Sequence, residues 1–453
     1  MTNRIKIVAG ITALLLIGGA TGLHLMPPEL LRVGAHYSAK IVCSNVFLTQ
    51  RDAQQVLADD VQAHGHPLLK YMQVNVDREH KLVRANLFGF IGGGVAVYRP
   101  GTGCAAVPDG NLNVAAGYQF ERAPLPLPPA NQPWPRGSGV EGNATIESIV
   151  ADDALAGPGM RGIVVIHQGK LLTQRYAKGF NETTPLLGWS MTKSVTAALI
   201  GMQVKAGKLK LDQAGFWPDP ARGAIKLADL MAVSSGLHFN EEYGDVSDVT
   251  RMLYQEADMA SYVHAQPLEH APGSTWSYSS GTTVLLLRLW QDAVGNAALS
   301  YPHDQLFAPL GMRSAILEAD ARGNMVGSSY MYATAQDWAR FGQFLLQDGV
   351  WNDNRLLPEG FVAMMSSAAS ASHGQYGQGQ VWRWGPEGNT PAGQNPDTPF
   401  HLPADTYWMQ GHDGQSVAII PSKQLVVVRL GLTPHRLFYQ PQALVAAIAN
   451  TLN

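Results

Sequence analysis

The sequence predicts an α+β protein in which an antiparallel sheet is flanked by helices. Two apolar runs, 162–168 and 171–176, surround a glycine turn, and the runs 416–420 and 425–430 surround a second turn at Pro421–Lys423. Apolar runs around short turns are typical of β-hairpins. The region between the two hairpins is mostly helical in pattern. We therefore expect both hairpins to join one sheet that the helices cover.

Length and composition describe a globular protein. The chain has 453 residues, 46% of them hydrophobic and 15% charged, which is enough for two or three domains with substantial cores. The formal net charge is −3 and there is no basic run. Nucleic acid is therefore not an expected partner, because its binding needs a positively charged surface.

The N-terminus has the pattern of an export signal. Ile7 to Leu25 is nearly all apolar or small and follows Arg4 and Lys6. The stretch is about as long as the roughly 20 residues that cross a bilayer, and no clean cleavage site follows it. We expect residues 1–29 to be an uncleaved signal anchor in the inner membrane, with the remainder facing the periplasm. A cleaved signal peptide and secretion to the periplasm is the alternative.

The chain has two cysteines, Cys43 and Cys104. Outside the cytoplasm they can form a disulfide, which would stabilise the fold by roughly 4 kcal/mol through loop closure. Two unpaired buried thiols are the alternative.

Residues 30–122 form a mixed α/β segment in which 50–64 is predicted to be helical. The stretches 71–77 and 82–87 alternate like strands. Residues 89–98 are rich in glycine but lack the spacing of a nucleotide-binding loop, so we interpret them as a bend that enters a strand.

A proline-rich stretch at 123–139 excludes both helix and sheet pairing over its length. We predict an extended, semi-rigid connector there, with a separate domain over 140–453.

Ser190 and Lys193 are the strongest candidates for chemistry. A helix is predicted to begin at or near Ser190, because apolar residues recur after it at helical spacing. These are Val195, Ala198, Leu199 and Met202. Residues three apart lie on one helix face, which brings the lysine amine within reach of the serine hydroxyl. A neutral lysine can accept the serine proton, and burial can lower its pKa enough to make it neutral. A capping serine followed by a solvated lysine is the alternative interpretation.

Five stretches together resemble the serine hydrolases of the β-lactamase and penicillin-binding type, with the nearest likeness to 6-aminohexanoate-dimer hydrolases. The resemblance extends from about Arg161 to Leu432 and rests on 187–196, 231–237, 276–281, 307–312 and 411–415. It implies a β-lactamase/transpeptidase-like fold with a helical subdomain. It also implies hydrolysis through an acyl-enzyme on Ser190. Neither a cofactor nor a metal is expected.

The resemblance assigns further residues to the site. Tyr278 stands at the tyrosine of the family's Y-x-N motif, which implies a second acid/base that passes a proton to the leaving group. Ser280 replaces the asparagine of that motif and lacks the paired donor and acceptor of an amide. Tyr243 lies in a polar loop and either lines the substrate site, as a loop tyrosine does in amide-cleaving relatives, or forms a surface turn.

The family's third motif, K-T-G or H-x-G, fits two registers. One uses 412–414, and the other, which we prefer, uses 409–411. In the preferred register Gly411 is the first glycine, and the N–H groups of Ser190 and His412 form the oxyanion hole. Met409 then stands where penicillin-recognising members carry a cation, which argues against a dedicated β-lactamase or DD-peptidase.

The sequence thus predicts a serine hydrolase, an esterase or amidase that acts on small-molecule esters or amides. One alternative is a β-lactamase or DD-peptidase acting on β-lactams or peptidoglycan. Another is a cell-envelope binding or sensor module without catalytic activity. His264 and His270 do not have the spacing of zinc ligands and are predicted to be loop or surface residues. The sequence does not predict an oligomeric state.

Overall fold

The computed structural model describes residues 8, 11, 18–19, 21–129 and 131–452. Most of the predicted signal anchor lies outside these residues. Within the described part of the chain, no helix combines the length and the apolar character needed to cross a bilayer.

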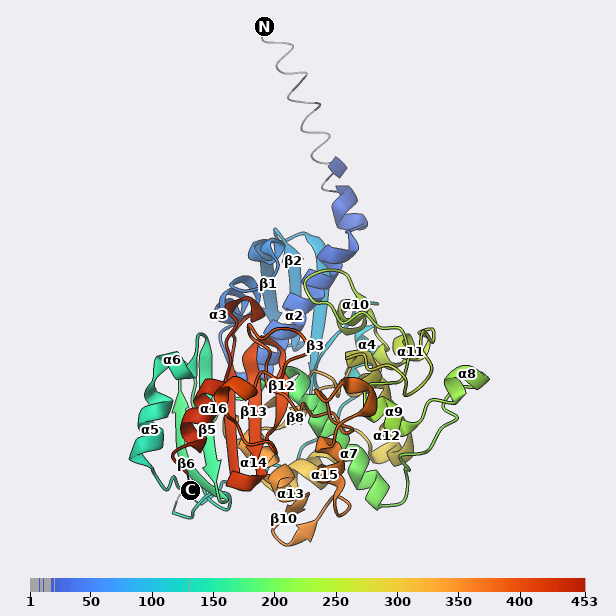
Figure 1. Ribbon diagram of the computed structural model, residues 1–453. Helices are drawn as coiled ribbons and strands as arrows, with labels where there is room; N and C mark the ends of the chain where they lie inside the picture. Colours follow the sequence, from blue (N-terminus) through green and yellow to red (C-terminus); the bar gives the residue numbers. More distant parts are fainter. Residues whose placement is uncertain (1–7, 9–10, 12–17, 20, 130, 453) are drawn as a thin grey trace.

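The two predicted hairpins form one antiparallel sheet. The first consists of β5 (Met160–His167) and β6 (Lys170–Tyr176), and the second of β13 (Gln415–Ile420) and β14 (Leu425–Gly431). β14 pairs with β5, and β12 (Tyr407–Gly411) adds an edge strand, so the order is β12-β13-β14-β5-β6 (Figure 1). The predicted α+β class with a sheet built from both hairpins is confirmed.

Both faces of this sheet are buried under helices. One face packs against α14 (Ala335–Leu346), and the other against α5 (Ala144–Ala151) and α16 (Gln442–Ala449). Successive strand residues point to opposite faces. Ile163 and Val165 of β5 accordingly lie in the cluster with α5 and α16, while the residues that alternate with them lie in the cluster with α14.

The helical region between the hairpins is built around α7 (Thr192–Lys205), which packs against α12 (Ser280–Val294). Every residue of α7 from Thr192 to Gln203 is buried. The smaller elements of this region are β7 (Leu186–Leu187), α8 (Pro220–Gly223), α9 (Leu227–Met231), α10 (Asp248–Gln255), α11 (Met259–His264), α13 (Ala308–Leu310), β8 (Ile316–Leu317), β9 (Met331–Ala333), β10 (Val350–Trp351), β11 (Asn354–Arg355) and α15 (Phe361–Ser366).

The N-terminal segment is a long helix on a four-stranded sheet, in the upper part of Figure 1. The helix α2 (Glu29–Thr49) lies against the sheet, whose strands follow in sequence order: β1 (Met72–Asp77), β2 (Leu82–Leu87), β3 (Ile91–Arg99) and β4 (Gly103–Ala106). A Cβ atom at Gly94 would lie 2.3 Å from the carbonyl carbon of Ala35. The glycine-rich stretch therefore lets a strand approach the helix closely.

The secondary structure predicted for this segment is largely found. The stretches 71–77 and 82–87 form β1 and β2, and the stretch 89–98 leads into β3. The predicted helix at 50–64 is α3 (Ala53–Val56), followed by a π-helical turn. The sequence analysis did not predict α2.

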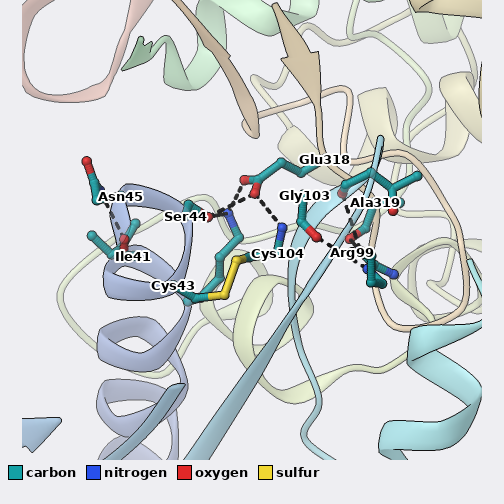
Figure 2. The surroundings of a disulfide bond; sticks show 11 residues. Ile41, Cys43, Ser44, Asn45, Arg99, Gly103, Cys104, Glu318 and Ala319 are labelled. Atoms are coloured by element: carbon teal, nitrogen blue, oxygen red, sulfur yellow. Dashed lines mark hydrogen bonds and ion pairs between the residues drawn. A yellow bond between two sulfur atoms is a disulfide. The ribbon is translucent and has the colours of Figure 1, made fainter. Parts of the chain in front are cut away.

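A buried cluster attaches α2 to the rest of the protein (Figure 2). Cys43 of α2 forms a disulfide with Cys104 of β4, which confirms the predicted pairing. Beside it, Lys40 forms a fully buried ion pair with Glu318. Glu318 also accepts hydrogen bonds from Ser44 Oγ at 2.9 Å and from the backbone N–H of Cys104 at 2.7 Å. The Glu318 carboxylate thus holds the helix and the strand to the helical region.

The proline-rich stretch 123–139 contains no helix and no sheet strand over its described residues. Trp134 is buried, and the guanidinium of Arg340 lies 5.5 Å from its ring. The connector is thus packed on the second part of the chain, and its role as a domain boundary stays a prediction. The short helix α4 (Leu112–Ala116) precedes it.

Removing the disulfide should destabilise the protein. The cysteines are 61 residues apart, and releasing a loop of that length lowers the free energy of unfolding by about 4 kcal/mol in the chain-entropy model. We expect this loss for the Cys43→Ser/Cys104→Ser variant in urea denaturation, and a similar loss for the wild type in reducing buffer. A change below about 1 kcal/mol in both would contradict the structural role assigned to the bond.

Candidate active site

Ser190 and Lys193 meet where α7 begins. Ser190 lies in a 3₁₀ turn, Trp189–Met191, and α7 starts two residues after it, at Thr192. The Nζ atom of Lys193 lies 3.0 Å from Ser190 Oγ, as the three-residue spacing predicts. Ser190 is half-buried, so part of the residue is accessible to solvent.

The lysine amine is enclosed by the fold. Lys193 is 1% exposed, and its Nζ also lies 3.0 Å from Ser280 Oγ and 3.1 Å from the carbonyl oxygen of Ser328. Burial disfavours the charged form and lowers the pKa of Lys193 to about 8, while the carboxylate of Glu241 opposes this shift. At pH 7 about a tenth of the amine is therefore neutral, far more than for a lysine in water, and most of it is neutral above pH 8.

Glu241 is a member of the site that the sequence analysis did not select. Its carboxylate accepts hydrogen bonds from Ser280 Oγ at 2.5 Å and from the backbone N–H of Ser280 at 2.7 Å, at the start of α12. Burial raises the pKa of Glu241, and the charge of Lys193 counteracts this. No sequence signal separates Glu241 from its exposed neighbour Glu242, because only the fold directs one of them inward.

Ser280 connects this carboxylate to the lysine. Its hydroxyl lies between Glu241 Oε1 and Lys193 Nζ, within 3.0 Å of both. A hydroxyl can donate one hydrogen bond and accept others. The serine that replaces the expected asparagine therefore extends a continuous chain of contacts from Ser190 through Lys193 to Glu241.

Tyr278 lies over the same amine. The Lys193 Nζ is 4.8 Å from the centre of the tyrosine ring, and the hydroxyl of Tyr278 interacts with the side chains of Ser190 and Trp382. Burial raises the pKa of Tyr278. Trp382 and Tyr376 pack against the tyrosine ring, with ring centres 5.2 and 5.9 Å away. The resting phenol is therefore protonated, and the neighbouring rings hold it beside the serine.

The preferred register of the third motif lies on a strand next to the serine. Gly411 ends β12, and a Cβ atom there would lie 2.2 Å from the carbonyl oxygen of Gly188. Only glycine fits such a close approach. Met409 is buried in the core, whereas residues 412–414 form the turn between β12 and β13. The two registers and the oxyanion role of the His412 N–H stay predictions.

Aromatic rings form the other side of the site. The ring of His412 stacks on Tyr243 with 4.8 Å between ring centres, and Trp189 lies edge-on to His412 at 5.6 Å. Tyr243 is partly buried and interacts with the side chain of Ser280. Trp189, directly before Ser190, has a φ of 47°, a left-handed conformation that bulky residues rarely adopt.

The structure thus brings Ser190, Lys193, Tyr278 and Ser280 into direct contact, with Tyr243, Gly411 and His412 beside them. The two cysteines belong to the structural cluster described above. Sequence reasoning missed Glu241 and the aromatic partners of Tyr278, which lie about a hundred residues after it in the chain.

Comparisons with known proteins agree with this architecture. A family model described as Beta-lactamase matches residues 143–447. No curated protein matches the chain. Because the family model covers more than half of the chain, the chain belongs to the β-lactamase family of serine hydrolases.

Several solved structures share the fold. One is a protein from Bacillus anthracis that is named as a predicted 6-aminohexanoate-dimer hydrolase. It has a TM-score of 0.57 and 20% sequence identity, and the match covers 90% of this chain and 98% of that chain. A penicillin-binding protein homolog from Caulobacter crescentus has a TM-score of 0.53 and 15% identity, over 69% and 98%. A penicillin-binding protein from Bacillus halodurans has a TM-score of 0.52 and 17% identity, over 68% and 100%.

The reactivity of Ser190 should follow the protonation of Lys193. Only the neutral amine accepts a proton, so labelling by a fluorophosphonate should speed up as pH rises through about 8. Glu241 raises the lysine pKa, so Glu241→Gln should move the midpoint of this rise to lower pH. Labelling rates measured across the pH range test this.

Glu242→Gln is the matched control, because it removes the same charge from an exposed neighbour and should leave the midpoint in place. An unchanged midpoint in Glu241→Gln, or a labelling rate independent of pH, would contradict the assignment.

Proposed function

We propose that this protein is a serine hydrolase that cleaves esters or unstrained amides through an acyl-enzyme. The observation that carries the proposal is the buried amine of Lys193, 3.0 Å from Ser190 Oγ and 4.8 Å from the centre of the Tyr278 ring. A hydroxyl, a neutral base and a second proton carrier in contact form a complete set for nucleophilic acyl transfer.

In the proposed reaction, neutral Lys193 accepts the proton of Ser190 as Oγ bonds to the substrate carbonyl carbon. The N–H groups of Ser190 and His412 stabilise the resulting oxyanion. The nearby carboxylate of Glu241 offsets the charge gained by Lys193. Tyr278 protonates the leaving amine or alkoxide as its bond to carbon breaks, and regains a proton from Lys193. Water then attacks the acyl-enzyme by the same route in reverse and releases the acid.

The chemistry around the site favours esters and linear amides over β-lactams and peptidoglycan. In the preferred register Met409 takes the place of the cation, and its side chain is buried in the core. A substrate carboxylate would lack the charge partner used by penicillin-recognising enzymes. Penicillin turnover by the wild type would instead support a β-lactamase or DD-peptidase.

We also propose that the protein acts in the periplasm, either anchored to the inner membrane or secreted. Two observations support this. The Cys43–Cys104 disulfide is of a kind that persists in oxidising compartments. The apolar side chains of Leu23, Leu25 and Met26, within the predicted anchor segment 1–29, are exposed.

Ser190→Ala should abolish the activity. Removing the nucleophile should lower kcat/KM for p-nitrophenyl esters by at least about a thousandfold and eliminate fluorophosphonate labelling. Ester and linear-amide hydrolysis by folded wild-type and variant protein tests this. Well-folded wild type that neither hydrolyses the substrates nor becomes labelled would support a binding or sensor module instead.

Tyr278→Phe should impair amide cleavage more than cleavage of p-nitrophenyl esters. An amine must be protonated to leave, whereas p-nitrophenolate leaves as an anion, so losing the phenol should reduce kcat for amides by about a hundredfold or more. Tyr376→Phe, on a neighbouring ring, is the matched control. Equal losses for both substrate types in Tyr278→Phe would refute the role of leaving-group acid.

A further inference from the structure

A cavity of about 320 Å³ adjoins the site on the side of Trp189, Tyr243 and His412. Its opposite wall comes from the N-terminal segment, which supplies mainly apolar side chains from α2, from the 3₁₀ turn before β1 and from the first residue of β1. These are Leu30, Leu31, Val33, Leu68, Leu69 and Met72. The volume lies within the range of small-molecule sites. Exposed residues at the rim, among them His64 and Arg436, keep the cavity accessible.

The position of the cavity identifies the part of the substrate that can enter it. Trp189 directly precedes the proposed nucleophile, and the N–H of His412 is the proposed second oxyanion donor. Tyr278, the proposed leaving-group acid, is not among the lining residues, and its aromatic partners Tyr376 and Trp382 are not either. Ser190 itself does not line the cavity, which begins at the residue before it. Because the cavity lies away from the proposed leaving-group acid, the acyl portion is the part of a substrate that extends toward it.

We propose that this cavity binds the hydrocarbon chain of the acyl group, so that the enzyme prefers esters or amides of medium-chain fatty acids. This inference rests on the proposed function, because it names the substrate class of the same site. An apolar chain is favoured because leucine, valine and methionine side chains form one wall and offer no hydrogen bonds. Each methylene that leaves water for such a wall adds to transition-state binding.

The N-terminal segment thereby gains a role in specificity. The family model begins at residue 143, so the apolar wall lies outside the part of the chain that the model matches. The disulfide and the Lys40–Glu318 ion pair hold α2 in place. The wall is therefore rigidly positioned against the proposed site, as a specificity-determining surface must be.

The direct test is a chain-length series. For p-nitrophenyl acetate, butyrate and octanoate, kcat/KM of the wild type should rise by about tenfold or more from acetate to octanoate. Leu68→Trp and Leu30→Trp, which fill the cavity from two different elements, should each lower the octanoate-to-acetate ratio of kcat/KM by about tenfold. Leu127→Trp is the matched control, because Leu127 is 83% exposed and outside the cavity, and it should keep the wild-type ratio.

A binding measurement separates this inference from the proposed function. Calorimetric titration of Ser190→Ala with octanoate should show binding that the added Leu68→Trp or Leu30→Trp exchange weakens by about tenfold. If esters are not hydrolysed but octanoate binds in this way, the cavity assignment stands and the proposed hydrolysis fails. A ratio unchanged by both tryptophan exchanges in folded protein, or octanoate binding that neither exchange weakens, would overturn the inference.

Discussion

The amine of Lys193 is enclosed in the protein, and the arrangement of the site depends on how that enclosure is achieved. The helix α7 is buried on all sides over most of its length, and the lysine at its start is 1% exposed. Burial favours the neutral amine and lowers the pKa of Lys193. The Glu241 carboxylate, which is hydrogen-bonded to the Ser280 hydroxyl, limits how far this pKa falls. A deeply buried lysine with no counter-charge would be neutral but would resist taking a proton. A buried lysine in direct contact with a carboxylate would stay protonated at neutral pH.

The protein surrounds this site with three separate parts of the chain. The helical region supplies the lysine from α7, the serine from the 3₁₀ turn before α7 and the tyrosine from the loop before α12. The edge strand β12 closes the site beside Gly188. The N-terminal segment forms the outer wall of the adjoining cavity. The helix α2 is largely buried against its sheet and α10, and a buried ion pair together with a disulfide also attaches it near Glu318. Stability and substrate selection are thus coupled through α2.

Much of this was predictable because short-range patterns encode it. Apolar runs around short turns predicted the two hairpins, and the three-residue spacing of Ser190 and Lys193 predicted their contact. The helix α2 was missed because its buried positions lie on more than one face, against the sheet and against α10, so it has no single apolar stripe. Glu241 was missed because two adjacent glutamates differ only in the direction the loop gives them. The cavity was missed because its walls are far apart in sequence.

The most direct test of the central claim is the Lys193→Arg exchange. Arginine keeps a positive charge near Ser190 but stays protonated at any ordinary pH, so it can stabilise charge and cannot accept the serine proton. If neutral Lys193 is the base, the folded variant should lose at least about a thousandfold in kcat/KM for esters across the whole pH range. An arginine variant that retained activity within about tenfold of the wild type would show that the cation alone suffices, and would contradict the account.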